Sequence, residues 1–311
     1  MRLLSELPDA ARGTRPAAVT IGSFDGIHVG HLRLLARTVA EARRIDGEAA
    51  VVTFDPHPRC VVDPRGCPPL LTALDERLEL IAAAGIDTAV VLRFTRELSL
   101  WSAERFVAGL CGAFALRRLV SGPGFALGSG RTGTIEYLRG EGAKRGFRVI
   151  TAAPARQDGV RVSSGRVRDA LAAGRLGEAN RLLGRPYSLA GTVGRGSQIG
   201  RRLGFPTANL TVDPARCLPA TGVYATWFEL EGQRLAAASS VGYRPTFGGG
   251  TLTVEAHVLD YSADLYGQKA RLWFLRRLRA ERMFSSERTL ARQMVRDVDR
   301  TRTLLQAVGA A

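Results

Sequence analysis

The first half of the chain alternates short apolar runs with longer segments in which apolar residues recur every three or four positions. The short runs have the length of strands and cover residues 17–24, 49–54, 88–94, 118–121 and 147–151. The longer segments predict amphipathic helices, one with Leu32, Leu35, Val39 and Ala42 on one face and others over 75–84, 102–111 and 135–145. Strands that alternate with helices predict βαβ units and an α/β doubly wound parallel sheet, in which ligands bind at the carboxyl ends of the strands.

From Tyr187 the pattern changes to short alternating strands separated by glycine and proline. These strands are expected at 188–193, 222–229, 234–241, 251–260 and 270–278, a spacing typical of a small antiparallel β-barrel. A last helix begins near Ser286 and repeats its apolar residues on one face, at Leu290, Met294, Val298 and Leu305. We therefore expect two domains, an α/β domain over 1–186 and a β-barrel with a C-terminal helix over 187–311.

Composition agrees with two globular domains. The chain has 311 residues, of which 45% are hydrophobic, and this is enough for two cores. No apolar run reaches the ~18 residues that a membrane span needs. The N-terminus carries Glu6 early and lacks the apolar stretch of a signal peptide, so we expect a cytoplasmic protein with no membrane partner. The four cysteines (Cys60, Cys67, Cys111 and Cys217) show no metal-ligand spacing and are expected to be ordinary thiols.

The net charge of +15 raises the question of a polyanionic partner. The positive charge comes almost entirely from arginine dispersed along the chain, since Lys144 and Lys269 are the only lysines. Nucleic-acid-binding proteins concentrate their basic residues on one face or stripe. The dispersal therefore favours anionic small molecules such as nucleotides, and it leaves a nucleic-acid partner as the less favoured alternative.

The stretch 200–209 has the pattern of a glycine-hinged loop that runs through Pro206 into a short strand. Because side chains alternate across a strand, Thr207 and Asn209 point to the same side. Their hydroxyl and carboxamide oxygens suit a hard cation such as Mg²⁺ that carries nucleotide phosphates. The structural alternative is a glycine-rich hairpin with no ligand. The chain contains no Gly-x-x-x-x-Gly-Lys-Ser/Thr motif, which excludes a P-loop kinase.

His28 and His31 lie three positions apart at the expected start of a helix and so share one of its faces. The amides of a first helical turn attract anions, and imidazole N–H groups there can hold phosphates and stabilise charge that develops during transfer. Gly26 and Gly30 leave room for a phosphate close to the backbone. Two alternatives are a zinc site, for which no third ligand lies nearby in the sequence, and histidines that only cap the helix.

A second polar cluster, formed by Ser163, Ser164 and Arg168, opens another predicted helix. The hydroxyls can bind phosphate oxygens at the helix N-terminus, and the guanidinium can pair with them in a bidentate way. The alternative is a serine that caps the helix and an arginine on its solvated face.

Gly-Phe-Pro-Thr-Ala-Asn at 204–209 resembles the signature of riboflavin kinases, and His-Val-Gly-His at 28–31 resembles that of nucleotidyltransferases. Ser-Ser-Gly-Arg-Val-Arg at 163–168 is similar to the Ser-Ser-Thr-x-Ile-Arg element of the same nucleotidyltransferases. With further segments in the same order, the chain resembles the bifunctional bacterial riboflavin kinase/FAD synthetases over nearly its whole length. The resemblance implies that the barrel phosphorylates riboflavin to FMN with ATP. It also implies that the α/β domain transfers AMP from a second ATP to FMN, giving FAD and pyrophosphate.

The same resemblance implies roles for individual residues. Thr207 and Asn209 would hold Mg²⁺ and the phosphates, and Glu255 would be the general base on the flavin hydroxyl. The run 191–204 would close as a lid over ATP, and His28 and His31 would be the catalytic pair of the α/β domain. The implied nucleotide-binding residues are Gly22, Phe24, Gly26, Gly30, Ser163, Ser164 and Arg168 in the α/β domain and Gly200, Arg201 and Pro206 in the barrel. The implied flavin-binding residues are Tyr224, Arg279 and Phe284.

Three positions of the α/β domain depart from the family pattern. Ser23 stands where Asn is usual before Phe-Asp-Gly, Gly165 stands where a Thr hydroxyl is expected, and Gly124 stands where the family has Asp or Asn. Each change removes a hydrogen-bonding partner for substrate. The alternative function is therefore a riboflavin kinase whose N-terminal domain is inactive or has changed its substrate. A third hypothesis is a non-catalytic flavin or nucleic-acid binder.

Overall fold

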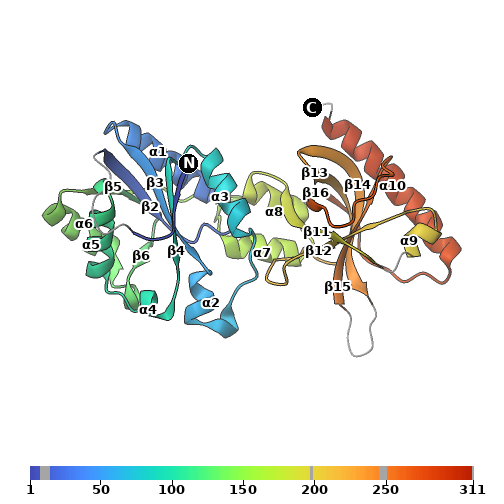
Figure 1. The fold of residues 1–311 in the computed structure, drawn as a ribbon, viewed down its shortest axis with the longest axis horizontal. Helices are drawn as coiled ribbons and strands as arrows, with labels where there is room; N and C mark the ends of the chain where they lie inside the picture. The colour runs from blue at the N-terminus through green and yellow to red at the C-terminus, as the bar shows by residue number, and fades with distance from the viewer. Residues whose placement is uncertain (8–14, 197–198, 245–250, 310–311) are drawn as a thin grey trace. The chain divides into compact units, whose positions relative to one another are not determined.

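The computed structural model describes residues 1–7, 15–196, 199–244 and 251–309 (Figure 1). The chain forms two compact units, Met1–Ser164 and Gly165–Ala311. The first is an α/β unit with a parallel sheet, and the second is a closed antiparallel barrel with a C-terminal helix. The fold class expected from the sequence pattern is confirmed.

The first unit is built on a six-stranded sheet in which every pair of neighbours is parallel. In spatial order its strands are β1 (Arg2–Leu4), β4 (Thr88–Arg93), β3 (Glu48–Asp55), β2 (Pro16–Ile21), β5 (Ala115–Ser121) and β8 (Arg148–Thr151). β3 and β4 lie on one side of β2, whereas β5 and β8 lie on its other side. The strand order therefore reverses between β2 and β5, and such a switch point opens a crevice at the carboxyl ends of the strands.

Helices cover both faces of this sheet. Successive strand residues point to opposite faces, and apolar residues at successive positions therefore give each face a core that a helix must cover. The four main helices are α1 (Val29–Arg43), α3 (Leu74–Ala83), α5 (Ala103–Ala113) and α6 (Ile135–Arg145). Val51 belongs to a buried core that it shares with α1 and α3, whereas Val52 belongs to a second core with α5 and α6. Strands buried on both faces need apolar residues at successive positions, which is why they appear in the sequence as unbroken apolar runs.

Short elements fill the connections of the first unit, and the connection between β3 and α3 contains a disulfide. These elements are α2 (Pro58–Val62), η1 (Pro64–Gly66), α4 (Arg96–Ser99), η2 (Ser129–Arg131) and the strand pairs β6 (Ala126–Leu127) with β7 (Gly133–Thr134) and β9 (Arg156–Gln157) with β10 (Val160–Arg161). Between α2 and η1 the chain reverses and brings the Cα atoms of Cys60 and Cys67 within 4.2 Å. These two residues form a disulfide, so the expectation of four ordinary thiols is wrong for this pair. Cys111 and Cys217 are thiols, as expected.

The second unit is a closed six-stranded barrel in which neighbouring strands are antiparallel. Around the barrel its strands are β11 (Tyr187–Gly194), β12 (Ala208–Thr211), β15 (Thr251–Val258), β14 (Gln233–Arg244), β13 (Gly222–Leu230) and β16 (Lys269–Arg279). The strands expected from the alternating pattern are confirmed. The short strand expected after Pro206 is β12, which closes the barrel between β11 and β15.

Helices of the second unit flank the barrel. They are α7 (Ser164–Ala172), α8 (Leu176–Leu183), α9 (Ile199–Arg202) and α10 (Glu287–Gly309). The expected C-terminal helix is α10, which packs on β13 and β14 and buries Val298 and Leu305 (Figure 1). Because α8 packs on β11 and β16, the compact units divide at Ser164, ahead of the change in strand pattern near residue 186. The division into 1–186 and 187–311 stays a prediction about the functional domains.

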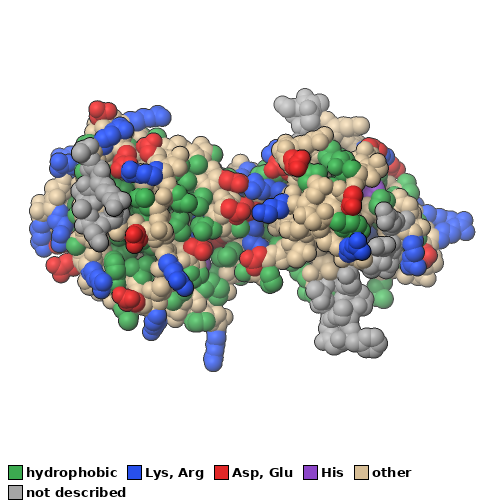
Figure 2. Space-filling view, in the orientation of Figure 1, with side chains coloured by type: hydrophobic (Ala, Val, Ile, Leu, Met, Phe, Trp, Pro, Cys, Tyr) green, Lys and Arg blue, Asp and Glu red, His purple; other side chains and the backbone are tan. Residues whose placement is uncertain are grey.

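The charged surface agrees with the dispersal of arginine along the sequence. On the face that Figure 2 shows, Lys and Arg side chains are spread over both units and are mixed with Asp and Glu. Within the ranges that the structure describes, no helix combines the length and the apolar character that crossing a membrane requires.

Candidate active sites

The first unit has a cavity of about 320 Å³ at the carboxyl ends of three strands. Its lining includes the residues that directly follow them, namely Gly22 after β2, Gly122 after β5 and Ala152 after β8. Other lining residues come from the start of α1 and from 161–164. The cavity thus lies at the switch point of the sheet, which is where doubly wound folds bind their ligands.

His28 and His31 line this cavity as a stacked pair. Their ring centroids lie 3.7 Å apart with an interplanar angle of 12°, and Phe24 meets the ring of His31 edge-on. His28 is also the N-cap of α1, since its Nδ1 accepts the backbone N–H of His31 at 3.2 Å. The neutral ring therefore carries its proton on Nε2 and has an N–H donor there. One nitrogen of His28 thus caps the helix, and the other carries the N–H group.

The glycines near these histidines serve different purposes. Gly22 and Gly30 line the cavity, and a Cβ on Gly30 would lie 3.0 Å from the ring of His28, so glycine lets that ring lie over the first turn of α1. Gly26 lies away from the cavity, with φ +83°, and a Cβ there would meet the side chain of Leu71 at 2.7 Å. Its backbone conformation and its packing are what require glycine here, and the phosphate contact expected for Gly26 stays a prediction.

Ser163 and Ser164, the last residues of the first unit, line the same cavity. The Oγ of Ser164 donates to the backbone carbonyl of Asp25 at 2.8 Å, which ties Ser164 to the loop before α1. Arg168 lies one turn further along α7. The structure thus brings the two serines to the site that the sequence predicts for them.

Arg161 also lines this cavity, although the sequence reading did not assign it a role. Its Nη2 donates to the carbonyl of Pro123 at 3.3 Å, in the loop where the sequence departs from the family pattern. In that loop a Cβ on Gly122 or Gly124 would lie in open space among the described residues. A guanidinium two positions before the serine pair was a signal that could have identified Arg161.

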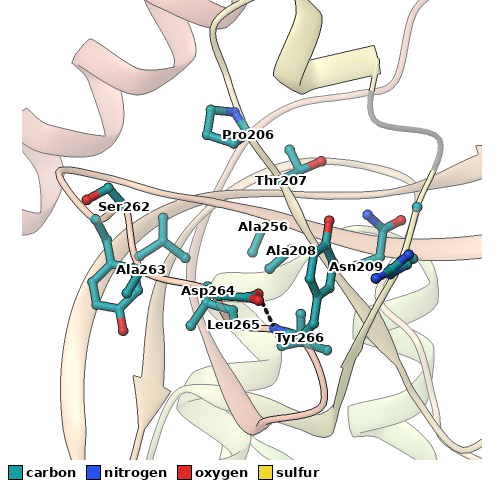
Figure 3. A pocket seen from close by; sticks show the side chains of 15 residues that line it. Pro206, Thr207, Ala208, Asn209, Ala256, Ser262, Ala263, Asp264, Leu265 and Tyr266 are labelled. Atoms are coloured by element: carbon teal, nitrogen blue, oxygen red, sulfur yellow. Dashed lines mark hydrogen bonds between the residues drawn. The ribbon is translucent and has the colours of Figure 1, made fainter.

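The barrel carries a cavity of about 460 Å³, which Figure 3 shows from close by. Pro206, Thr207 and Asn209 line it from the segment that enters β12, and the loop 261–266 lines it from the chain that follows β15. Arg195 lies over the ring of Tyr266, with its guanidinium carbon 5.6 Å from the ring centroid. The sequence did not predict a binding role for this loop, because its mixture of tyrosine, serine and aspartate carries no ligand signature.

Glu255 lies beside Thr207 and Asn209, the arrangement that the resemblance implied. In the β12–β15 pair Asn209 lies directly opposite Glu255, and the Oγ1 of Thr207 donates to Oε2 of Glu255 at 3.3 Å. Residues directly opposite each other in an antiparallel pair have their side chains on the same face. A hydroxyl, a carboxamide and a carboxylate therefore gather at one point of the barrel wall.

A smaller cavity of about 150 Å³ lies between the barrel and α10. Its lining comes from the barrel strands at Glu255, His257 and Arg279 and from α10 at Leu290, Met294, Asp297 and Val298. Thr207 lines both this cavity and the larger one. Ligands held in the two cavities would therefore approach each other at Thr207.

Arg279 and Phe284, expected on the flavin side, lie next to each other, and Arg279 lines this smaller cavity. The guanidinium of Arg279 is 5.6 Å from the ring centroid of Phe284. It also makes a bidentate ion pair with Asp297 of α10, with Nη2 to Oδ2 at 2.8 Å and Nε to Oδ1 at 3.2 Å. The sequence reading missed Asp297, because only the packing of α10 on the barrel brings it to Arg279.

Tyr224 lies elsewhere, in the interior of the barrel. Its side chain is fully buried, its hydroxyl donates to the carbonyl of Ala220, and its ring meets Phe274 edge-on. Burial raises the pKa of the Tyr224 phenol above its usual value. The structure therefore does not support the flavin contact that we expected for Tyr224.

The remaining predicted residues of the barrel site surround the turn before Pro206. Gly200 lies in α9, where a Cβ would meet the carbonyl oxygen of Phe205 at 2.4 Å, so this turn requires glycine. The side chain of Arg201 and residues 197 and 198 of the expected lid lie outside the described residues. The roles expected of Arg201 and of the lid stay predictions.

The donor atoms at the junction of the two barrel cavities fit Mg²⁺. Thr207, Asn209 and Glu255 offer oxygen atoms only, and Mg²⁺ prefers oxygen ligands, typically a few protein groups together with substrate phosphates.

Both units match known families. The riboflavin kinase family model matches residues 183–305, and the FAD synthetase family model matches residues 11–166. The chain is 37% identical over 306 residues to the bifunctional riboflavin kinase/FMN adenylyltransferase of Pseudomonas fluorescens, a match that covers 98% of both chains. It is 34% identical over 300 residues to the protein of the same description from Escherichia coli (strain K12), with 96% of each chain covered.

A solved structure extends this similarity to three dimensions. The crystal structure described as a macrolide-efflux protein from Streptococcus pneumoniae matches with a TM-score of 0.87 and 30% identity, covering 96% of this chain and 98% of that one. The similarity therefore spans both units in one chain. With a FAD synthetase domain followed by a riboflavin kinase domain, the chain belongs to the family of bifunctional riboflavin kinases/FMN adenylyltransferases.

Proposed function

We propose that the barrel transfers the γ-phosphoryl group of ATP to the terminal hydroxyl of the riboflavin side chain, with ATP in the larger cavity and the flavin in the smaller one. The observation that carries this proposal is that Thr207 lines both cavities and donates a hydrogen bond to Glu255. Phosphoryl transfer depends on bringing donor and acceptor together in line. A residue shared by two adjoining cavities marks the point where that can happen.

Glu255 is the proposed general base of this reaction. Its carboxylate accepts the proton of the flavin hydroxyl while the hydroxyl oxygen attacks the γ-phosphorus and ADP leaves. The hydrogen bond from Thr207 orients the carboxylate toward the junction of the cavities. In this scheme Arg279 and Phe284 hold the flavin. The guanidinium carbon of Arg279 lies 5.6 Å from the ring centroid of Phe284.

Thr207 and Asn209 would hold Mg²⁺ through their oxygens on the side of the larger cavity, and the cation would neutralise charge on the phosphates of ATP. Pro206, Gly200 and Arg201 belong to the loop that we assign to ATP. Tyr266 offers an aromatic face in the same cavity for the adenine base.

We further propose that the first unit joins AMP to FMN. An oxygen of the FMN phosphate attacks the α-phosphorus of ATP, and pyrophosphate leaves. The attacking phosphate is already an anion, so the residues need to bind and stabilise charge rather than remove a proton. His28, His31 and Arg161 supply N–H donors from the cavity lining, and Ser163 and Ser164 add hydroxyl groups to the same lining.

The test incubates the full chain with riboflavin, ATP and Mg²⁺ and separates the flavins by chromatography. We expect FMN to form first and FAD afterwards. Glu255→Gln keeps the shape of the side chain but removes the base, so FMN formation should fall by ~10²-fold or more, while FAD formation from supplied FMN stays unchanged.

Glu229→Gln is the matched control for this variant. Glu229 is a strand glutamate of β13 whose carboxylate bonds to Arg234 and Trp273, away from the lining of both cavities. We expect both reactions at wild-type rates. If Glu255→Gln formed FMN at the wild-type rate, Glu255 would not be the general base. If the wild-type chain formed no FMN, the proposed kinase function would be wrong.

A second candidate function is a riboflavin kinase whose first unit does not make FAD. It is favoured by the cavity wall at 122–125, where Gly-Pro-Gly-Phe offers no hydrogen-bonding side chain. Supplying FMN as the only flavin with ATP, or other mononucleotides with ATP or CTP, distinguishes the candidates. FAD and pyrophosphate formed from FMN and ATP support the bifunctional enzyme. Pyrophosphate that forms only with another mononucleotide, or only with CTP, supports a changed substrate.

We propose riboflavin, FMN and ATP as the ligands of this protein, with Mg²⁺ as its cofactor. Because ATP is made and used inside the cell, we propose a cytoplasmic location. We also propose that the functional domains divide near residue 186, just before the first barrel strand.

A further inference from the structure

The loop between β2 and α1 holds the cavity-lining residues of the first unit in an uncommon backbone conformation. Phe24 has φ +51°, Gly26 has φ +83° and Ile27 has φ +38°. Non-glycine residues adopt such values only where their surroundings hold them there. Phe24 and His28, at either end of this stretch, both line the cavity. What fastens the loop therefore also fixes the positions of these two rings.

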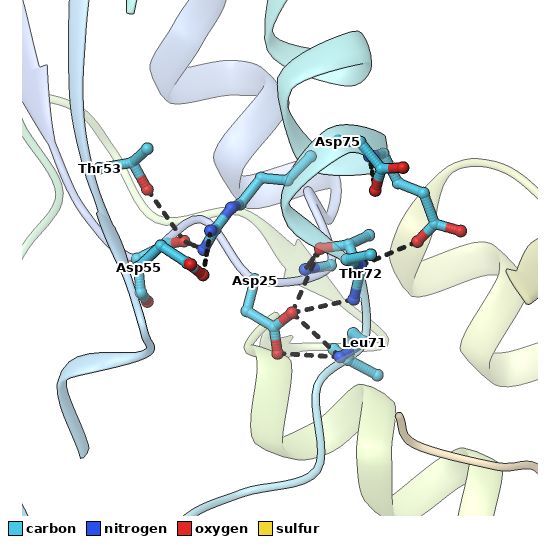
Figure 4. A network of polar contacts seen from close by, with 11 residues as sticks. Asp25, Thr53, Asp55, Leu71, Thr72 and Asp75 are labelled. Carbon is cyan, nitrogen blue, oxygen red and sulfur yellow. Dashed lines mark hydrogen bonds and ion pairs between the residues drawn. The ribbon is translucent and has the colours of Figure 1, made fainter. Parts of the chain in front are cut away.

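Thr72 and Asp25 fasten the loop from outside the cavity (Figure 4). The Oγ1 of Thr72 donates to Oδ1 of Asp25 at 3.2 Å and accepts the backbone N–H of Gly26 at 3.0 Å. The same Oδ1 accepts the backbone N–H groups of Thr72 and Leu71, each at 3.0 Å. One hydroxyl and one carboxylate thus join the loop to the segment before α3.

These bonds lie in the interior of the unit, where water does not compete for them. Asp25 is 1% exposed and Thr72 is 6% exposed. The backbone carbonyl of Asp25 accepts from Ser164, which lines the cavity, at 2.8 Å. The carbonyl of Ser23 accepts from Thr53 and from the buried Arg77 at 3.3 and 2.8 Å. Asp25 therefore connects its own loop to the segment before α3 and to Ser164.

We propose that Thr72 is a positioning residue for adenylyl transfer: through Asp25 and the amide of Gly26 it sets where Phe24 and His28 meet the substrates. This inference rests on the proposed adenylyltransferase function of the cavity. Thr72 itself lies outside the cavity lining and acts only through the loop. Such a residue affects the rate by geometry, because catalytic groups are effective only near their productive positions.

The test compares three threonine substitutions in the full chain, with FMN and ATP as substrates. Thr72→Val keeps the side-chain shape but removes both hydroxyl bonds, and Thr72→Ser keeps the hydroxyl. Thr38→Val is the matched control, because Thr38 is an equally buried threonine of the same unit whose hydroxyl bonds only within α1, to the carbonyl of Leu34 at 2.9 Å. FMN formation from riboflavin in the same preparations reports that the barrel is intact.

We expect Thr72→Val to lower kcat for FAD formation by ~10- to 100-fold and to change KM for FMN and ATP by less than ~3-fold, since misplacement by about 1 Å costs up to ~10²-fold. Thr72→Ser and Thr38→Val should keep kcat within ~3-fold of the wild type, a margin small beside that loss. Thr72→Val and Thr38→Val should lower the thermal midpoint of the first unit alike. If Thr72 had a purely structural role, kcat would instead fall in proportion to the thermal midpoint, and Thr38→Val would lose as much kcat as Thr72→Val.

Asp25→Asn keeps the test decisive if Thr72→Val does not fold. It retains the Oδ1 acceptor but presents an amide to the N–H of Leu71, which Oδ2 accepts at 3.1 Å, so kcat should fall in the same direction with KM little changed. Equal losses of kcat in Thr38→Val and Thr72→Val, or wild-type kcat in both Thr72→Val and Asp25→Asn, would overturn the inference. Absence of FAD with the wild-type chain would instead overturn the proposed function and the inference with it.

Discussion

Gly196 determines how closely the backbone approaches Asn209 in the larger barrel cavity. An ideal Cβ on Gly196 would lie 2.1 Å from Nδ2 of Asn209, so an alanine there must displace the carboxamide. We expect Gly196→Ala to lower kcat/KM for ATP in FMN formation by ~10-fold or more, because shifting a ligand-binding group by about 1 Å costs up to ~10²-fold. Initial rates of FMN formation at varied ATP concentration measure this effect.

Gly177→Ala is the control for that substitution. Its Cβ would make an ordinary contact at 3.8 Å with Arg181 in α8, so kcat/KM should match the wild type. If Gly196→Ala also matched the wild type, Asn209 would have no part in binding the nucleotide.

Cys111 gives a prediction about thiol reactivity. Burial raises the pKa of this thiol above its usual value, Arg145 opposes the shift, and Glu141 adds to it. A raised pKa means less thiolate at any given pH, and the thiolate is the species that reacts. At pH 8 we therefore expect Cys111 in the folded chain to be alkylated by iodoacetamide more slowly than in the chain unfolded by guanidinium. Peptide mapping by mass spectrometry reads this out, and equal rates in the two states would contradict it.

At the scale of single residues, the sequence predicted well those arrangements that depend on local spacing. His28 and His31 share a helical face because they are three positions apart, and Thr207 and Asn209 line one cavity because strand side chains alternate. The orientation of Tyr224 depends on which face of β13 the closed barrel turns inward. No local pattern contains that information, which is why the expectation for Tyr224 failed.

Two glycines of α6 test how closely this helix packs. Gly140 would place a Cβ in open space among the described residues, whereas a Cβ on Gly142 would lie 2.4 Å from the carbonyl oxygen of Phe147. Gly140→Ala should raise the free energy of unfolding of the first unit by about 0.5–1 kcal/mol, because alanine loses less backbone entropy in a helix. Gly142→Ala should lower it by about 1–3 kcal/mol, because the backbone must move apart.

Denaturant unfolding followed by circular dichroism distinguishes the two substitutions. They replace the same residue type two positions apart in one helix, so helix propensity contributes equally to both. A change of the same sign in both variants would mean that the close approach of Gly142 to Phe147 does not determine their stability.

At the scale of elements, length decided what the sequence could predict. Apart from β1, the strands of the two main sheets and the long helices were expected, because each repeats its apolar pattern over several positions. The pairs β6–β7 and β9–β10 have two residues per strand and β1 has three, too few for a period to be visible. The Cys60–Cys67 disulfide was missed for a related reason, since only the reversal between α2 and η1 brings the two residues together.

At the scale of the whole molecule, each unit carries its own cavity and its own set of candidate catalytic groups. The sequence predicted both units and the order of their reactions. It did not predict the cavity between α10 and the barrel or the fastening of the histidine loop by Thr72. Both depend on contacts between segments far apart in the chain, such as Arg279 with Asp297 and Gly26 with Thr72. Motifs therefore indicated candidate reacting groups, whereas the fold was needed to find which contacts hold them in place.

The last prediction concerns the passage of FMN between the two reactions. Glu255→Gln should make FMN from riboflavin ~10²-fold more slowly, and His31→Ala should stop at FMN, so neither protein alone should convert riboflavin to FAD at an appreciable rate. Because each cavity is formed within a single unit, we expect an equimolar mixture of the two variants to make FAD after a lag in which FMN accumulates in solution. Adding FMN at the start should abolish the lag, and trapping free FMN with an excess of an FMN-binding apoprotein should prevent FAD formation. FAD that forms from riboflavin and the wild-type chain in the presence of the same trap would contradict this expectation, because it would mean that FMN passes between the two sites of one molecule without entering solution.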